Sequence, residues 1–171
     1  QGERMALNTP IQGSSADILK KAMLECDVVL ITGGASVGDF DVTPKAMEKA
    51  GIRLLFQGVD MKPGKACEYG VCGEKLVCGL SGHPSSSLTN LLLVGLAGLR
   101  KMSGIKDYLP KEIDLVLAND FGKQSKNDRV IRGTLMIEDG IAKIRVPKGQ
   151  GNVMISSTIG SDCVAVVPGG R

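Results

Sequence analysis

The sequence predicts an α/β protein that ends in a small all-β part, and two observations indicate this. Before about residue 105, short apolar runs rich in β-branched residues alternate with segments of helical periodicity, which is typical of helices packed on a sheet. From Lys111 onward no helical pattern is evident, and Asn, Asp and Gly turns separate four apolar segments: IDLVLAND, RVIRGTLMI, IAKIRV and CVAVV. We therefore expect a boundary between the two parts at residues 105–110.

The first expected elements are a helix and a strand. Ser14 with Asp17 has the spacing of a capping box, so the helix is expected over about residues 15–25. Its apolar stripe consists of Ile18, Leu19, Ala22 and Met23. Residues 28–32 are a continuous β-branched run, which is typical of a strand buried on both faces of a parallel sheet.

A second helix and another strand follow. Thr43 is expected to cap this helix, with Pro44 at its first position and Gly51 just beyond its end. Residues 52–56 form the next apolar run. Helix and strand thus continue to alternate.

The α/β part is expected to end in a hairpin and a long helix. Residues 66–71 and 75–79 have the pattern of two strands that turn at residues 73–74. The longest helix is expected over about residues 86–103, where leucines form a broad apolar face and Gly104 follows. In the all-β part, the E-D-G sequence at residues 138–140 is a further hairpin signal.

Composition excludes several classes of function. The formal net charge is only +3 and aromatic residues make up 3% of the chain, so neither a nucleic-acid partner nor a base-stacking platform is indicated. Five cysteines occur without a C-x-x-C pair and are expected to be buried, reduced thiols. The single histidine, His83, excludes sites that need two. No apolar run approaches the ~20 residues of a membrane span, so a soluble cytoplasmic protein is expected.

A glycine-rich loop, ITGGASVGDFD at residues 31–41, leaves the end of the first strand. Glycines let backbone N–H groups approach an anion, and Ser36 could add a hydroxyl donor. Asp39 and Asp41 would repel a phosphate unless a divalent cation such as Mg²⁺ bridged them. The loop therefore indicates either a phosphate site with a metal or an ordinary Gly/Asp turn between strand and helix.

A second loop, MKPGK at residues 61–65, places two lysines around a Pro-Gly turn. Lys62 and Lys65 could converge on one oxyanion. Taken alone, the pattern favours a surface turn with two solvated lysines over an oxyanion site.

A third loop, GLSGHPSSS at residues 79–87, leads from a strand through glycines into the start of a helix. Spare backbone N–H groups there could bind an anion, but residues 85–87 could also simply cap the helix. His83 could act as a general acid or be an ordinary loop residue, and a single histidine without a second titratable partner in the motif favours the loop residue.

The order of the three loops strengthens each of them. If all three lie at the same edge of one sheet, they would build a single anion cleft. Neither a Walker A loop nor a G-x-G-x-x-G fingerprint is present, which argues against an ordinary nucleotide hydrolase or dehydrogenase.

These motifs resemble those of a known family. ECDVVLITGGASVGDFD, VDMKPGKACEYG, VCGLSGHPSSS and the leucine-rich helix are similar to the molybdopterin-binding domain of the molybdopterin molybdenumtransferases, the group of MoeA and the gephyrin E-domain. KEIDLVLAND through VMISSTIGSDCVAVVPGG resembles the family's small C-terminal β-barrel domain. The resemblance covers about residues 26–170. It implies a truncated three-layer molybdopterin-binding domain at residues 26–107 and a β-barrel domain at residues 108–171.

The resemblance also implies a function. The family inserts molybdate into adenylylated molybdopterin, with Mg²⁺, and releases AMP, and its members are homodimers. By this resemblance Asp41, Lys62 and Lys65 are catalytic, and Asp41 is the Mg²⁺ ligand. The residues implied to bind substrate are Gly33, Gly34, Ser36, Gly38, Ser81, Gly82, His83, Pro84, Ser85 and Arg132, and residues 152–157 match positions near the same cleft.

The sequence differs from the family pattern at two motifs, and one portion of the family's chain is not found in it. Gln57 stands where a lysine is often found, which removes one charge from the anion site. Ser81, Gly82 and His83 stand where the family usually has Pro-Gly-Asn. The elongated N-terminal portion of the family, whose dimer partner completes the active site, is expected to be missing, so activity of this chain is uncertain from sequence.

Residues 3–23, ERMALNTPIQGSSADILKKAM, instead resemble a segment of bacterial family A DNA polymerases in which the glutamine matching Gln12 lies near the primer terminus. Residues 1–25 are therefore interpreted as a polymerase-like helical segment of a chimera. The chimera could be a natural fusion, a recombination product or an accident of sequence assembly. The catalytic carboxylates of a polymerase are absent, and a DNA polymerase fragment is only a remote alternative.

Two hypotheses of function follow. The first is a molybdenum-cofactor transferase that keeps the half of the site for pterin phosphate and molybdate. The alternative is a non-catalytic molybdopterin-binding or scaffold fragment. The shortened sheet is also expected to leave an exposed edge at residues 28–32, which would promote self-association.

Overall fold

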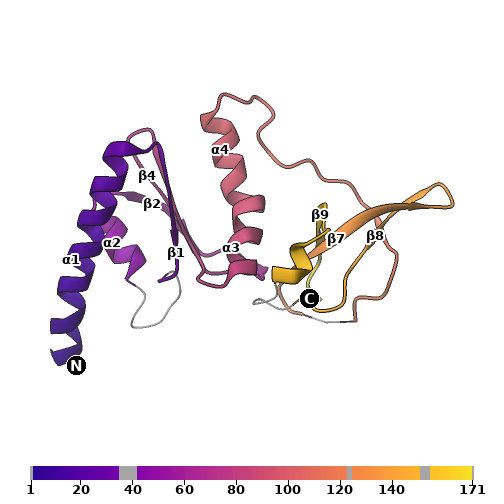
Figure 1. Ribbon diagram of the computed structural model, residues 1–171, viewed down its shortest axis with the longest axis horizontal. Helices are drawn as coiled ribbons and strands as arrows, with labels where there is room; N and C mark the ends of the chain where they lie inside the picture. Colours follow the sequence, from indigo (N-terminus) through magenta and orange to yellow (C-terminus); the bar gives the residue numbers. More distant parts are fainter. Residues whose placement is uncertain (1, 35–41, 123–124, 151–154, 171) are drawn as a thin grey trace. The chain divides into compact units, whose positions relative to one another are not determined.

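The computed structural model describes residues 2–34, 42–122, 125–150 and 155–170 (Figure 1). The chain divides into two compact units. The first comprises Gln1–Val59 and Ala66–Gly82, and the second comprises Asp60–Lys65 and His83–Arg171. The division at residues 25/26 and 107/108 expected from the sequence stays a prediction.

The first unit begins with one long helix. Helix α1 (Gly2–Glu25) has 24 residues and starts well before the capping box at Ser14, so the expected start near residue 15 is wrong. The capping box needs non-helical backbone at Ser14, and here that residue lies within the helix. The side chains that enter the core are Ala16, Leu19 and Met23, whereas Ile18 of the expected stripe is 68% exposed.

The sheet of the first unit is mixed. Its strands, in spatial order, are β1 (Val28–Thr32), β5 (Lys75–Leu80), β4 (Cys67–Cys72) and β2 (Arg53–Gln57). β1 runs parallel to β5, and the other two pairings are antiparallel. β1 is an edge strand and only half-buried, so the expectation of a strand buried on both faces of a parallel sheet is wrong, whereas the expected exposed edge is present.

Helix α2 (Thr43–Lys49) lies beside α1, and both contact the strands next to them in the chain (Figure 1). Met47 on α2 is fully buried in a cluster with Leu19, Met23 and Val77. Gly51 follows the helix at φ +83°, as expected. Thr43 is not the N-cap, because Val42 holds that position and the Thr43 hydroxyl donates a hydrogen bond elsewhere.

The second unit contains the leucine-rich helix. Helix α3 (Pro84–Asn90) continues through a π-helical turn, η1 (Leu91–Gly95), into α4 (Leu96–Met102), and Gly104 follows at φ +76°. The expected helix over residues 86–103 is therefore confirmed, but α1 is longer. The π turn was not predicted, since no sequence pattern marks it.

Five strands complete the second unit. They are β3 (Met61–Lys62), β6 (Val116–Leu117), β7 (Asp128–Glu138), β8 (Ile141–Arg145) and β9 (Cys163–Val167), in the order β3-β7-β8-β6 with β9 paired to β7. Asp139 and Gly140 both have positive φ, which confirms the predicted hairpin turn. The expected absence of helix after residue 105 fails at one 3₁₀ turn, η2 (Ile155–Thr158).

The strands of the second unit enclose a hydrophobic core of their own, and the cysteines of the chain differ in burial. Ile131, Ile144 and Val146 form the core of the β part. All five cysteines are free thiols, but only Cys67 and Cys78 are buried, and Cys26 is exposed contrary to expectation. No helix within the described residues has the length and apolar character needed to cross a bilayer.

Because Cys78 is buried, we expect the free energy of unfolding to depend on pH in the alkaline range. Burial first, and then the neighbouring Cys67, raise the pKa of Cys78 from 9.0 to about 12. In the unfolded chain the thiol ionises near pH 9, while the folded thiol stays neutral. The stability that the neutral thiol contributes is thus fully present below pH 9 and is lost as the pH rises toward 12.

We expect the free energy of unfolding of the wild type to fall more steeply above pH 9 than that of Cys78→Ala, by up to ~1.4 kcal/mol per pH unit. Urea unfolding at a series of pH values measures this difference. Cys26→Ala, which removes the exposed thiol, is the control and should keep the wild-type profile. Parallel profiles for wild type and Cys78→Ala would contradict the prediction.

Candidate functional site

The first and third predicted loops meet at one edge of the first unit's sheet. Because β1 and β5 run parallel, Gly33 after β1 and Ser81 after β5 leave the sheet at the same edge. The Gly33 amide donates a hydrogen bond to the Leu80 carbonyl at 2.9 Å. A Cβ placed on Gly82 would lie 3.4 Å from the Gly33 Cα, so the two backbones are nearly in contact.

The start of the glycine-rich loop requires glycine. Gly33 and Gly34 have φ of +90° and +65°, which side-chain-bearing residues rarely adopt. Thr43 holds the loop from α2: its Oγ1 donates to the Gly33 carbonyl at 3.0 Å, and its amide donates to the Gly34 carbonyl at 3.2 Å. A Cβ on Gly34 would lie 2.7 Å from Thr43 Oγ1. The sequence-predicted residues Ser36, Gly38 and Asp41, together with Asp39, lie outside the described residues.

Glu68 is a buried acid near this edge that the sequence analysis missed. It is fully buried on β4, opposite Gly79, where a Cβ would lie 2.6 Å from Glu68 Oε2. Gln57 Nε2 donates to Glu68 Oε1 at 3.5 Å, so the residue that stands in place of the family's lysine is directed at this carboxylate. An acid within the apolar strand sequence ACEYGVC was the available signal.

The K-P-G-K loop does not lie at the edge of this sheet. Lys62 ends β3, and β3 pairs in parallel with β7 in the sheet of the second unit. The expectation that all three loops follow strands of one sheet is therefore wrong, because the chain leaves the first unit after β2 and β3 joins the other sheet. Lys62 and Lys65 are both exposed, the Lys62–Pro63 peptide bond is cis, and Gly64 has φ +105°.

Asn90 holds the K-P-G-K turn and was also missed. Its side chain is fully buried, and Nδ2 donates to the Gly64 carbonyl at 2.9 Å. A Cβ on Gly64 would lie 2.7 Å from Met61 Cε and 3.4 Å from the Ser86 carbonyl, so the turn is tightly enclosed. A lone Asn amid the leucines of the helix was the available signal.

The start of helix α3 is arranged differently from simple serine capping. His83 is the N-cap residue and makes no side-chain capping bond, while Ser87 Oγ donates back to the His83 carbonyl at 3.2 Å. The capping interpretation of residues 85–87 is therefore wrong. His83 and Pro84 are exposed, and Ser85 is buried.

Arg132 and Ser85, both predicted site residues, are brought together inside the second unit. Arg132 lies on β7 and is 4% exposed, and its Nη1 donates to Ser85 Oγ at 2.5 Å. The Gln150 side chain accepts a bond from the Arg132 amide at 3.1 Å and donates to the Arg132 carbonyl at 2.7 Å. Burial lowers the pKa of Arg132 from its ordinary value. Like Glu68 and Asn90, Gln150 is a buried polar residue that the sequence analysis missed, and no sequence pattern marks it.

Comparison with known proteins identifies the domain family. Residues 12–101, more than half of the chain, match the family model described as "Probable molybdopterin binding domain". The chain belongs to this molybdopterin-binding domain family. Its mixed α/β sheet with flanking helices agrees with the fold that the sequence resemblance implied. The match begins within the segment of residues 3–23 that resembles DNA polymerases, and the chimera interpretation stays a prediction.

Curated relatives and solved structures carry related names. The molybdopterin molybdenumtransferase of Staphylococcus aureus is 32% identical over 158 residues, covering 92% of this chain and 38% of that protein. That of Staphylococcus epidermidis is 36% identical over 118 residues, covering 69% and 28%.

Among solved structures, a molybdenum cofactor biosynthesis protein from Pyrococcus furiosus is 34% identical with a TM-score of 0.61, covering 88% of this chain and 46% of that one. A molybdopterin biosynthesis MoeA protein from Pyrococcus horikoshii is 28% identical with a TM-score of 0.64, covering 90% and 36%. The chain thus spans less than half the length of each of these relatives.

The described residues supply no complete metal site of their own. Within these ranges, no group of three or more His, Cys, Asp or Glu side chains could hold a metal ion. Asp41 lies outside them, as do residues 152–154 of the C-terminal segment expected near the cleft. Mg²⁺ often uses only one or two carboxylates plus phosphate oxygens, so a site at Asp41 would not need a protein cage. The expectation that all three loops build one cleft stays a prediction.

Asn90→Ala should destabilise the second unit. The buried Gly64 carbonyl would lose its donor, which costs about 1–3 kcal/mol. Urea unfolding measures the loss. Lys101→Ala, at an exposed position on the same helix, removes a cation–π contact with Tyr108 and should cost less than about 1 kcal/mol. Equal losses of stability for the two substitutions would contradict a stabilising role of the Asn90–Gly64 hydrogen bond.

Arg132 and Ser85 should be energetically coupled. A double-mutant cycle with Arg132→Met and Ser85→Ala is expected to give a coupling free energy of about 1.5–3 kcal/mol, because the hydrogen bond is buried and one partner is charged. The matched control is the cycle of Arg145→Met with Glu138→Ala, a partly exposed pair at 3.5 Å that should give less than about 1 kcal/mol. Additive effects at Arg132 and Ser85 would exclude the coupling.

Proposed function

We propose that the protein acts in molybdenum cofactor biosynthesis as a molybdopterin molybdenumtransferase, inserting molybdate into adenylylated molybdopterin and releasing AMP. The main support is the match of residues 12–101 to the molybdopterin-binding domain family, together with curated relatives that carry the transferase name. The chain covers 38% of the length of the S. aureus relative, so the activity of the whole protein is part of this proposal.

In this proposal, the edge of the first unit's sheet binds the pterin phosphate. Gly33 and Gly34 hold positive φ, and Thr43 engages both of their carbonyls, so the loop starts from a fixed backbone. Ser36 and Gly38 would continue the phosphate cradle with backbone and hydroxyl donors. Ser81 and Gly82 follow the neighbouring parallel strand, and the close approach of Gly82 to Gly33 supports a shared role.

Lys62 and Lys65 would hold the incoming oxyanion. Both side chains are exposed, and the turn between them is fixed by Asn90 and by the close packing around Gly64. Two ammonium groups on a rigid turn stabilise negative charge without reorganising. His83, Pro84, Ser85 and Arg132 complete the proposed substrate-binding set. Because Arg132 and Ser85 bind each other in the interior, their contribution would be to fix the start of the helix, and the exposed His83 would be the member that contacts substrate.

Asp41 would carry the metal. Mg²⁺ at this residue would neutralise charge on the phosphoanhydride of the AMP adduct. The remaining contributions come from the chain itself, through backbone N–H groups at the glycine loop and the two lysines. Homodimer formation, a cytoplasmic location and the choice of molybdate as the oxyanion belong to the same proposal.

The alternative is a molybdopterin-binding or scaffold module without turnover. The residues present here cover 38% of the S. aureus relative and 46% of the P. furiosus one. Complementation of a strain that lacks the transferase separates the two: rescue supports the enzyme, and tight molybdopterin binding without rescue supports the module.

Binding measurements test the site itself. Titration calorimetry should show that molybdopterin and its AMP adduct bind the wild-type chain, and that Lys62→Ala with Lys65→Ala weakens molybdate binding by about tenfold or more. Lys106→Ala with Lys148→Ala removes the same charge at other exposed positions and is the control. No binding of either pterin would overturn the function, whereas pterin binding with unchanged molybdate affinity would overturn only the role of the lysines.

A further inference from the structure

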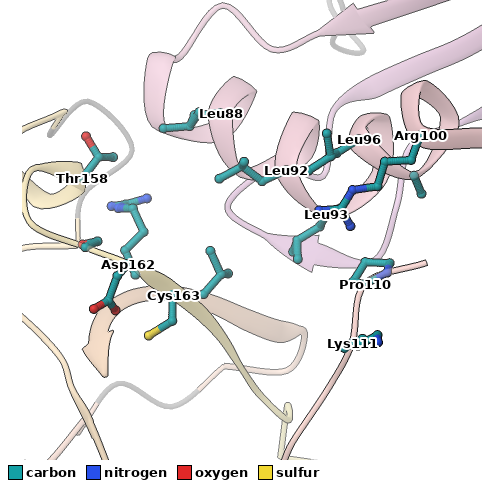
Figure 2. A pocket seen from close by; sticks show the side chains of 14 residues that line it. Leu88, Leu92, Leu93, Leu96, Arg100, Pro110, Lys111, Thr158, Asp162 and Cys163 are labelled. Carbon is teal, nitrogen blue, oxygen red and sulfur yellow. The ribbon is translucent and has the colours of Figure 1, made fainter. Parts of the chain in front are cut away.

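A pocket of about 540 Å³ lies within the second unit, and Arg132 is among the residues that line it (Figure 2). One wall is the leucine-rich helix, with Leu88, Leu92, Leu93 and Leu96. The opposite wall is formed by Thr158, Asp162 and Cys163 near the start of β9. Its volume is in the range of small-molecule sites.

The apolar wall of the pocket is incompletely covered. The side chains of Leu88 and Leu92 are 38% and 40% exposed. The other two leucines are half-buried. This surface would gain by contact with a hydrocarbon body.

Two cationic side chains also line the pocket: Arg100 on α4, and Lys111 in the segment that follows the helix. Figure 2 shows Arg100 and Lys111 on the side away from Asp162. Arg100 makes no ion pair with any carboxylate of the described residues, and Lys111 pairs only with Asp107, where both side chains are largely exposed. The single acid of the pocket, Asp162, accepts a hydrogen bond from the Leu135 amide at 2.7 Å, so it is already engaged.

We propose that this pocket binds a small amphipathic anion, with an acidic head at Arg100 and Lys111 and an apolar body along the leucines. A carboxylate, sulfonate or phosphate monoester head suits Arg100, which has no carboxylate partner among the described residues, and would share Lys111 with Asp107, whose carboxylate lies 2.9 Å from the Lys111 ammonium. An uncharged hydrocarbon would leave the cations unused, and an organic cation would be repelled. Arg132, which the proposed function assigns to holding the start of the helix, lines this pocket, whereas Lys62 and Lys65 do not.

The head group can be tested with three ligands of one chain length: decanoate, decanol and decyltrimethylammonium. Calorimetry on the wild-type chain should show that decanoate binds more tightly than the other two. Arg100→Gln with Lys111→Gln should weaken decanoate by about tenfold and leave decanol unchanged. Lys101→Gln with Lys106→Gln removes equal charge outside the pocket and should leave both affinities unchanged.

The location can be tested through the cysteines. Cys163 lines the pocket, while Cys26 is exposed in the other unit and serves as the internal control. Burial first, and then Asp162, raise the pKa of Cys163, so labelling with N-ethylmaleimide is done at mildly alkaline pH. Bound decanoate should slow modification of Cys163 at least several-fold and leave Cys26 unchanged, and Leu92→Glu should abolish this protection.

Three results would overturn the proposal. Equal affinity for decanoate and decanol would remove the role of the cations. Protection of both cysteines, or of neither, would place the ligand elsewhere. Concentration-dependent dimerisation in sedimentation that is lost in Leu92→Glu would show that a second copy of the chain covers the leucines instead. All three readouts are independent of molybdopterin, so they stand whether or not the transferase function holds.

Discussion

The parallel pairing of β1 with β5 is the constraint on which the site in the first unit depends. Parallel neighbours end at the same edge of a sheet, so the loop after Thr32 and the loop after Leu80 leave side by side. At Gly82 a Cβ would already touch the Gly33 backbone at 3.4 Å, and at Gly34 a Cβ would meet Thr43 Oγ1 at 2.7 Å. One strand pairing thus explains why two glycine-rich segments about fifty residues apart belong to the same feature.

Buried polar side chains fix the remaining loops. Asn90 binds the carbonyl of Gly64, Gln150 binds the backbone of Arg132, and Thr43 binds the carbonyl of Gly33. Each of these bonds joins residues at least ten positions apart and satisfies a backbone group of a loop or strand; the bonds of Asn90 and Gln150 are buried, and that of Thr43 is partly buried. Rigid loops presented by such contacts are what electrostatic stabilisation of an oxyanion requires.

Local patterns predicted the elements that depend on local physics. The strand at residues 28–32, the hairpin of β4 and β5, the turn at Asp139 and Gly140 and the leucine-rich helix all follow from periodicity or turn chemistry. The errors concern the starts of the first two helices. Ser14 has a capping pattern but lies within α1, and Thr43 has a capping side chain that instead binds Gly33. Ser14 is thus an interior residue of its helix, and Thr43 is the first residue of α2, one position after the N-cap Val42.

The sequence by itself determined the α/β class, the glycine positions and the family resemblance, because these reside in the order and spacing of residues along the chain. Only the tertiary structure decided that the K-P-G-K turn follows a strand of the second sheet, that Arg132 is held against Ser85, and that Glu68, Asn90 and Gln150 are buried partners. Strand pairing and side-chain burial join residues distant in sequence, and no local period encodes which distant residue will be the partner.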